Sequence, residues 1–396
     1  MNILIYIPEF GKDWGGVKQY SSTLLGIIKE DHHNHYFVYN DLKDPAVSDL
    51  IRDIPLHTVV NPQEINRPDN KIKKFYIRVF NFLFRILRIK QRVVLPDNFS
   101  SFCEKKSIQI IHCPYQYIPA TKAAKLITTM HDVQELHFPE FFTAEARAFR
   151  ARVYLDYLRR TDAVIVSYQH IKNDLVKYFQ VPEQKINIIL LEMDKLWFQS
   201  YLQSEPITLP EQFQHMRYLF YPANTWEHKN HIALLEAISS LKKEENLVIN
   251  LICTGQVTEQ QGTRILKKIS DMNISEHVHF PGLVDESLLY SIYKNAVGVV
   301  IPTLYEAGSF PLMESIFLGV PVICSNVTSL PETMGDEDFT FDPTDNLALK
   351  NKMKRLWLDE SFRKKSIANS LIQKNKLTKT DALRKIIKTY EDVLSQ

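Results

Sequence analysis

Short apolar runs alternate along this chain with longer segments in which apolar residues recur at steps of three or four. Short runs bounded by turn residues are typical of buried strands, and the longer spacing predicts amphipathic helices. Because strands and helices alternate, we expect an α/β domain in which helices cover both faces of a parallel sheet. In the first half, strands are expected at 2–7, 35–39, 108–111, 126–130, 163–166 and 186–190, and helices at 16–30, 143–160 and 168–179.

The rhythm begins again after a looser stretch, residues 199–214, that contains two prolines. We therefore predict two Rossmann-like, doubly wound domains that face a central cleft, the first over 1–205 and the second over 206–375. A C-terminal helix over 376–396 is expected to pack back toward the first domain. In the second series, strands are expected at 217–221, 247–253, 278–280, 297–301 and 320–324, and helices at 230–244, 258–272, 285–295 and 311–318.

Composition narrows the class of protein. The 396 residues are 45% hydrophobic and 24% charged, which is ordinary for a globular protein of this length. The net charge of +2 gives no reason to expect a nucleic-acid partner. We expect a cytoplasmic protein, since the chain has neither a secretory signal nor a long uncharged apolar run. Four cysteines without a CxxC pair are expected to be buried, reduced thiols: Cys103, Cys113, Cys253 and Cys324.

Two loops of the first domain carry candidate site residues. Gly15 and Gly16 follow the first strand and open a helix, where glycine lets the backbone approach a ligand and the helix N-terminus favours an anion. This is not the GxGxxG pattern, which argues against a dinucleotide-dependent dehydrogenase. His131 and Asp132 directly follow a strand, at the edge where ligands bind. The alternatives are a flexible turn at the glycines and a hydrogen-bonded loop pair at His131.

A loop of the second domain, residues 221–230, contains Asn224, His228 and Lys229. A lysine just before a helix is electrostatically unfavourable, because that end of a helix prefers negative charge. A bound phosphate would resolve the conflict at Lys229. The alternative is a solvated lysine whose side chain bends away.

The most informative loop follows the strand at 297–301. Pro311 suits the first turn of a helix, so backbone N–H groups around Ser309 and Phe310 are expected to face the cleft and to favour a diphosphate. Glu306 and Glu314 lie beside that anion site. Two carboxylates there are costly unless they accept hydrogen bonds, and sugar and ribose hydroxyls would donate them. The alternative is a capping pair on a surface helix.

Glu306 and Glu314, with seven residues between them, resemble the paired glutamates of retaining glycosyltransferases of the GT-B fold, family 4. Residues 280–332 are also similar to that family throughout, and residues 226–230 resemble its phosphate-binding loop. The resemblance covers most of the chain and is looser over 30–110.

The resemblance implies an enzyme that transfers a glycosyl group, with retention of configuration, from a nucleotide-diphosphate sugar to a hydroxyl of a glycan or lipid-linked glycan. The setting that it implies is cell-surface polysaccharide biosynthesis. No metal or other cofactor is expected, since basic groups and helix N-termini offset the charge of the leaving diphosphate. The expected catalytic residues are His131, Glu306 and Lys229, and the expected donor-binding residues are Gly15, Gly16, Asn224, His228, Lys229, Ser309, Phe310 and Glu314.

One departure from the family is Ala223, where an arginine often adds a second positive charge to the diphosphate site. Two alternatives therefore stay open. One is a non-catalytic protein of the same fold that binds a nucleotide sugar or serves as a partner subunit. The other is a nucleotide-sugar epimerase, which needs no acceptor. Asp336 and Asp338 match the D-x-D pattern of metal-dependent enzymes, but we expect a solvated turn there.

Residues 71–92 contain eight basic residues and no acidic one. Basic residues recur at steps of three or four between Phe, Leu and Ile, which predicts a helix with one basic stripe. Such a helix suits an anionic membrane surface, so we expect peripheral attachment to the inner face of the cell membrane. The alternative is a helix that packs on the sheet with its basic stripe in water.

Overall fold

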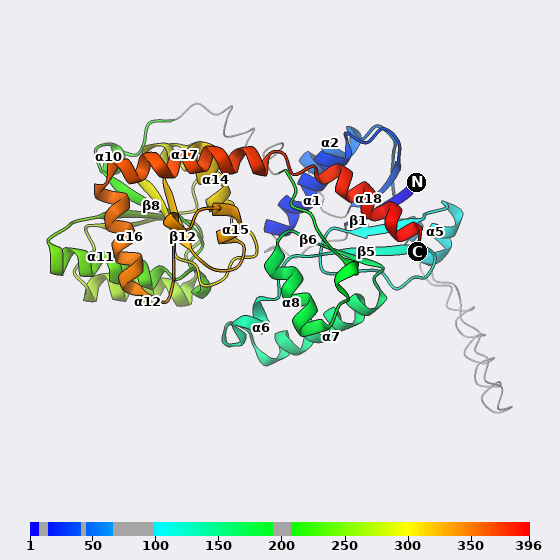
Figure 1. The fold of residues 1–396 in the computed structure, drawn as a ribbon, viewed down its shortest axis with the longest axis horizontal. Helices are drawn as coiled ribbons and strands as arrows, with labels where there is room; N and C mark the ends of the chain where they lie inside the picture. The colour runs from blue at the N-terminus through cyan, green and yellow to red at the C-terminus, as the bar shows by residue number, and fades with distance from the viewer. Residues whose placement is uncertain (8–14, 41–44, 66–97, 193–206) are drawn as a thin grey trace.

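A computed structural model describes residues 1–7, 15–40, 45–65, 98–192 and 207–396. Two parallel sheets, each covered by helices, lie side by side along the longest axis of the molecule (Figure 1). The predicted α/β class and the two doubly wound domains are confirmed. The predicted helix at 71–92 and the predicted boundary at 205 lie outside the described residues, so both stay predictions.

The first sheet has the strand order β3-β2-β1-β4-β5-β6-β7. Its interior strand β1 is apolar on both faces, because Ile3 and Ile5 enter one hydrophobic core and Leu4 enters the other. This pattern is expected where helices bury both sides of a parallel sheet. The strands are β1 (Asn2–Ile7), β2 (His35–Asn40), β3 (His57–Val59), β4 (Ile110–Cys113), β5 (Lys125–Met130), β6 (Ala163–Val166) and β7 (Ile186–Ile188). The helices are α1 (Gly15–Ile28), α2 (Pro45–Arg52), α3 (Pro62–Ile65), α5 (Asn98–Lys105), α6 (Gln134–His137), α7 (Ala144–Arg160) and α8 (Gln169–Phe179).

The second sheet has the order β10-β9-β8-β11-β12-β13. Its strands are β8 (Tyr218–Pro222), β9 (Asn250–Thr254), β10 (Val278–Gly282), β11 (Gly298–Ile301), β12 (Val322–Ser325) and β13 (Thr340–Phe341). Its helices are α10 (Glu211–Gln214), α11 (His231–Glu245), α12 (Glu259–Asp271), α13 (Glu286–Asn295), α14 (Phe310–Leu318), α15 (Leu330–Met334), α16 (Asn346–Leu358) and α17 (Glu360–Leu377).

The last helix, α18 (Ala382–Leu394), leaves the second domain and lies on the first, against α1 (Figure 1). Tyr390 on α18 is fully buried, and its hydroxyl lies 2.7 Å from Nδ1 of His112 on β4. The Glu192 carboxylate, after β7, accepts a hydrogen bond of 3.0 Å from the backbone N–H of Ala382. These contacts tie the end of the chain to the first sheet.

The structure differs from the predicted elements in two short strands and in helices that were not predicted, namely α2, α3, α5, α6, α10 and α15. Strands β3 and β13, of three and two residues, were not predicted because such short segments carry too little periodicity. The strand predicted at 320–324 begins at Val322, because Gly319 ends α14 with a left-handed backbone.

All four cysteines are buried and free, as predicted. No helix among the described residues is both long and apolar enough to span a bilayer.

Candidate active site

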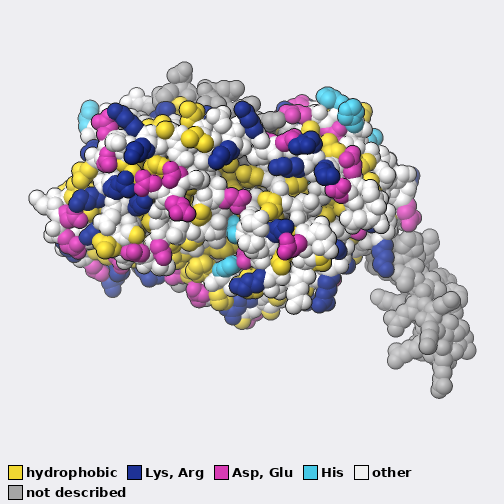
Figure 2. Space-filling model, viewed as in Figure 1, with side chains coloured by type: hydrophobic (Ala, Val, Ile, Leu, Met, Phe, Trp, Pro, Cys, Tyr) yellow, Lys and Arg dark blue, Asp and Glu magenta, His cyan; other side chains and the backbone are white. Residues whose placement is uncertain are grey.

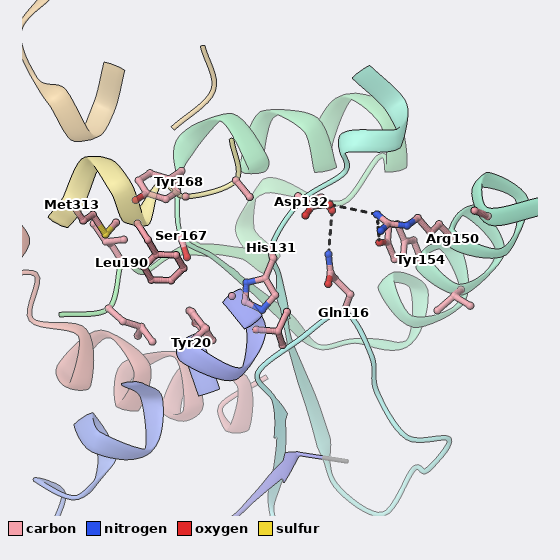
Figure 3. A pocket seen from close by; sticks show the side chains of 18 of the residues that line it. Tyr20, Gln116, His131, Asp132, Arg150, Tyr154, Ser167, Tyr168, Leu190 and Met313 are labelled. Atoms are coloured by element: carbon pink, nitrogen blue, oxygen red, sulfur yellow. Dashed lines mark hydrogen bonds and ion pairs between the residues drawn. The ribbon is translucent and has the colours of Figure 1, made fainter. Parts of the chain in front are cut away.

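A cavity of about 540 Å³ lies between the two domains. The helix start after β1, the loop after β5 and the turn after β6 form its first-domain walls, and the start of α14 forms the opposite wall. The carboxyl ends of the strands in both sheets therefore face this cavity, as the topology of open parallel sheets requires. Its lining includes Gly16, Val17, Tyr20, His131, Ser167, Tyr168, Leu190, Gly308, Phe310 and Met313 (Figure 3).

His131 lies near the centre of this cavity (Figure 3). Its Nε2 lies 3.0 Å from the backbone oxygen of Pro114, and since that oxygen can only accept, Nε2 carries the proton. The ring packs edge-on against Tyr20, with centroids 4.7 Å apart. Burial lowers the pKa of His131, although the Pro114 hydrogen bond and the nearby Asp132 oppose this effect. The imidazole is therefore neutral at pH 7, with Nδ1 as an acceptor.

Lys229 and Glu306 form an ion pair at the carboxyl edge of the second sheet. The Lys229 Nζ lies 2.7 and 3.0 Å from the two carboxylate oxygens of Glu306. Both side chains are largely buried, at 16% and 11% exposure. The short helix that ends at Lys229 is held beside the Glu306 loop, because the backbone oxygen of His228 accepts from the backbone N–H of Leu304 at 2.7 Å.

Glu314 lies on α14 and is only 5% exposed. The hydroxyl of Tyr293 on α13 donates a hydrogen bond of 2.5 Å to its carboxylate. Ser309 caps the same helix, since its hydroxyl accepts from the backbone N–H of Leu312 at 3.4 Å. The sequence-based alternative of a capping glutamate pair on a surface helix is wrong, because α14 is buried and the serine provides the cap.

Asn224 and His228 both lie in the loop at 221–230, which is the candidate phosphate-binding loop. The side-chain oxygen of Asn224 accepts from the backbone N–H of Gln256 at 2.7 Å, which joins the loops after β8 and β9. At Gly255 a Cβ atom would come within 2.7 Å of the Ala223 backbone, so this close approach requires glycine. Burial, followed by the charge of Lys229, lowers the pKa of His228 to about 3. His228 is therefore neutral and adds no positive charge beside Ala223.

Tyr305, next to Glu306, reaches from the second domain into the first. Its hydroxyl accepts a hydrogen bond of 3.4 Å from the backbone N–H of Val133, two residues after His131. Its ring lies 5.4 Å from the ring of His137, between centroids. Histidine side chains are visible at the junction between the two halves of the molecule (Figure 2). The His131 loop and the Glu306 loop are thus tied together by one buried aromatic side chain.

Sequence comparisons place both domains in known families. The family described as "Glycosyltransferase Family 4" matches residues 14–190, and "Glycosyl transferases group 1" matches residues 210–372. The chain is 25% identical over 334 residues to O-antigen chain mannosyltransferase B of Escherichia coli, covering 83% of this chain and 87% of that protein. It is 22% identical over 354 residues to O-antigen chain mannosyltransferase RfbU of Salmonella typhimurium, covering 89% and 90%.

Comparison with solved structures identifies the fold. The crystal structure of Anabaena HepE in complex with UDP superposes with a TM-score of 0.65 at 14% identity, covering 99% of this chain and 100% of that one. The chain is a glycosyltransferase of the GT-B fold. Both curated relatives named above are mannosyltransferases, so the epimerase and the non-catalytic alternatives gain no support from them.

In this glycosyltransferase the expected site residues fall into two groups. Gly16, His131 and Phe310 line the interdomain cavity, where a Cβ at Gly16 would lie 3.8 Å from the Phe310 ring. Gly15 begins α1 beside Gly16. The other group belongs to the second domain, includes the Lys229–Glu306 ion pair and does not line that cavity. It consists of Asn224, His228, Lys229, Glu306, Ser309 and Glu314.

Sequence reasoning missed several residues of this region, notably Arg150, Gly255, Tyr293 and Tyr305. The position of Tyr305 between β11 and Glu306 could have marked it as a site residue. Its contacts with Val133 and His137 could not be predicted from the sequence. Within the described ranges, no group of three or more His, Cys, Asp or Glu side chains is arranged to hold a metal ion. Asp338 of the D-x-D match instead pairs with Arg355 at 3.0 Å.

Proposed function

We propose that this glycosyltransferase moves a mannosyl group from a nucleoside-diphosphate mannose to a hydroxyl of a glycan or lipid-linked glycan in cell-surface polysaccharide synthesis. The observation that carries the proposal is the similarity to two O-antigen mannosyltransferases, which extends over both domains of this chain. A donor linked through a diphosphate is supported by the fold neighbour that binds UDP and by the positive charge of Lys229.

The donor belongs on the second domain in this proposal. Lys229 would bind the diphosphate, and the N-terminal end of α14 would add its positive dipole. Glu314 would accept hydrogen bonds from the ribose, and Glu306 would accept them from the donor sugar. The Lys229–Glu306 pair then rearranges on donor binding, because the ammonium exchanges a carboxylate for a phosphate oxygen.

The reaction that follows exchanges one C–O bond for another. The bond between the anomeric carbon and the diphosphate breaks while the acceptor hydroxyl oxygen bonds to the same carbon from the same face. The acceptor proton passes to the departing diphosphate oxygen. Lys229 stabilises the charge that develops there, and a preorganised donor of this kind lowers the barrier by about 3–4 kcal/mol. Neutral His131, with its Nδ1 as an acceptor, would orient a sugar hydroxyl beside the reacting carbon.

Retention of configuration, the absence of a metal requirement and a location on the inner face of the membrane belong to the same proposal. The resemblance of Glu306 and Glu314 to the paired glutamates of retaining enzymes supports retention. The membrane location follows from the basic composition of residues 71–92.

A panel of nucleotide sugars tests the proposal. GDP-mannose, UDP-glucose, CMP and dTDP sugars would be compared by thermal shift and by release of the free nucleotide, each with EDTA and with magnesium. We expect one nucleoside-diphosphate mannose to raise the melting temperature of the protein in EDTA. The same compound should be consumed in the presence of glycan acceptors. NMR of the new anomeric centre then reports its configuration. The proposal fails if no nucleotide sugar binds, or if wild type and Glu306→Gln consume the donor equally.

A further inference from the structure

Two polar side chains interrupt a buried apolar face of the first sheet, next to His131. They are His112 on β4 and Thr129 on β5, and both are fully buried. Thr129 and His131 are two positions apart, which places them on the same side of an extended chain. Ile110 and Ile127 on this side belong to one core with apolar residues of α1 and α18. Polar groups buried in such a core cost free energy unless they are hydrogen-bonded, so their partners indicate what they do.

A series of close contacts joins α18 to this face. The hydroxyl of Tyr390 lies 2.7 Å from Nδ1 of His112, and Nε2 of the same ring lies 3.3 Å from Oγ1 of Thr129. Since each hydroxyl can donate or accept, one neutral tautomer of His112 makes both hydrogen bonds. Burial keeps this ring neutral by lowering the pKa of His112 to about 3. His112 therefore connects the C-terminal helix to a residue two positions before His131.

Tyr20 on α1 extends this series to the cavity. Its ring lines the cavity and lies edge-on against His131, with centroids 4.7 Å apart (Figure 3). Burial raises the pKa of Tyr20 to about 12, and the side chain of Thr129 opposes that rise. The Tyr20 hydroxyl is thus buried beside Thr129, while the ring of the same residue supports one side of His131.

The start of α18 is fixed beside the same cavity. The Glu192 carboxylate is 5% exposed and accepts hydrogen bonds from the hydroxyl of Thr380, at 2.7 Å, and from the backbone N–H of Ala382, at 3.0 Å. Leu190 and Leu191, directly before Glu192, line the cavity. The C-terminal helix therefore contacts the walls of the site at its start as well as near its end.

We propose that the C-terminal helix positions His131 for the reaction, with Tyr390 and His112 as the positioning residues. Neither of the two is part of the cavity lining, so they act through Thr129 and Tyr20. The proposal rests on the proposed function, in which His131 orients a sugar hydroxyl beside the reacting carbon. Because α18 continues from the second domain, the half of the chain that holds the expected donor groups also orients a side chain of the other half.

Conservative variants separate positioning from stability. Tyr390→Phe removes only the hydroxyl, and Thr129→Val removes the next hydroxyl in the series with little change of shape. Each should lower kcat for mannosyl transfer about fivefold at an unchanged donor KM, because a misplaced group at the reacting centre slows turnover. The double variant should be no slower than the slower single variant, since both changes break one series of contacts. Tyr218→Phe, which loses a buried hydroxyl of the second domain, is the control and should keep the wild-type kcat.

NMR of histidine rings reports on His131 without any need for activity. The proteins are labelled at histidine Cε1, and the His131 signal is assigned by its loss in His131→Gln. We expect Tyr390→Phe and Thr129→Val to shift this signal and Tyr218→Phe to leave it in place. Rates and spectra are recorded under conditions in which chemical denaturation shows every variant to be folded.

Three results would overturn the inference: an unmoved His131 signal in both variants, losses of kcat that multiply in the double variant, or an equal loss in Tyr218→Phe. If the His131 signal shifts as expected but wild type consumes no nucleotide sugar, the proposed donor reaction is wrong and the positioning role stands. If wild type transfers mannose and Tyr390→Phe does so at the same rate, only the positioning role is wrong.

Discussion

Lys229 and Glu306 lie 77 positions apart in the chain, yet the Lys229 ammonium contacts both carboxylate oxygens of Glu306, at 2.7 and 3.0 Å. Each is an expected catalytic residue, and each is the counter-ion of the other. A change at either residue is therefore expected to alter both the transfer rate and the free energy of unfolding.

Lys229→Ala and Glu306→Gln should each lower the transfer rate at least tenfold. Removing one partner leaves a largely buried group unsatisfied, so we expect each single change to cost about 1–3 kcal/mol of unfolding free energy. The double variant should lose less than the sum of the two, since the removed groups are partners. Chemical denaturation and initial rates measure both effects. Lys350→Ala, which breaks the peripheral ion pair with Glu244, is the control and should leave the rate unchanged. Additive stability losses would contradict the coupling.

The Tyr293 hydroxyl fixes the Glu314 carboxylate at 2.5 Å. Tyr293→Phe should raise the KM for the donor severalfold, because Glu314 loses the group that orients it toward the ribose. Tyr218→Phe is the matched control: its hydroxyl is also buried and donates to a backbone oxygen, that of Ile292, at 2.8 Å. Both variants should lose about 1–2 kcal/mol of stability, and only Tyr293→Phe should change the donor KM. Equal KM changes would indicate a general packing effect.

Tyr305 joins the His131 loop to the Glu306 loop. Tyr305→Ala removes the ring that contacts His137 across the domain junction, at 5.4 Å between centroids. We expect kcat to fall at least tenfold while the nucleotide-induced thermal shift is kept, since the donor groups remain on the second domain. Tyr178→Ala removes a ring that packs on His137 from within the first domain, at 5.8 Å. A similar fall in kcat for Tyr178→Ala would argue against a role in joining the domains.

Buried neutral histidines predict a stability that falls in acid. Burial lowers the pKa of His112 to about 3, so the folded chain keeps this ring neutral while the unfolded chain protonates it below about pH 6.5. The unfolded state therefore binds more protons, and the unfolding free energy should fall by about 1.4 kcal/mol per pH unit for each such ring between those values. Denaturation at pH 7, 6 and 5 should show a shallower slope for His112→Asn. Replacing the exposed His32 in the same way should leave the slope unchanged.

Residues 71–92 predict binding to anionic membranes. Replacing Lys71, Lys74, Arg78 and Arg85 with glutamine should reduce flotation with phosphatidylglycerol vesicles, and high salt should have the same effect on the wild type. Neutral phosphatidylcholine vesicles serve as the reference. Lys364→Gln with Lys365→Gln, on the basic helix α17, is the control and should bind like wild type. If the α17 change removes binding and the 71–92 change does not, the membrane-facing segment has been misassigned.

The sequence by itself determined the fold class and the positions of most longer strands and helices. It could do so because a strand buried on both faces must be apolar throughout, and each covering helix must carry an apolar stripe. The glycines at 15 and 16, His131 and the glutamate pair also stood out locally, in the loops or helix starts that follow a strand. These candidate residues could be identified from the sequence because the strand or helix next to each of them is recognisable from neighbouring residues in the chain.

Only the tertiary structure decided which of these groups meet. The Lys229–Glu306 pair, the Tyr293 bond to Glu314 and the Arg150 cluster in the cavity join residues from different elements. No local pattern encodes such contacts, because they depend on how the helices and loops of two sheets pack against one another. Tyr305 is the clearest case, since its partners belong to the other domain.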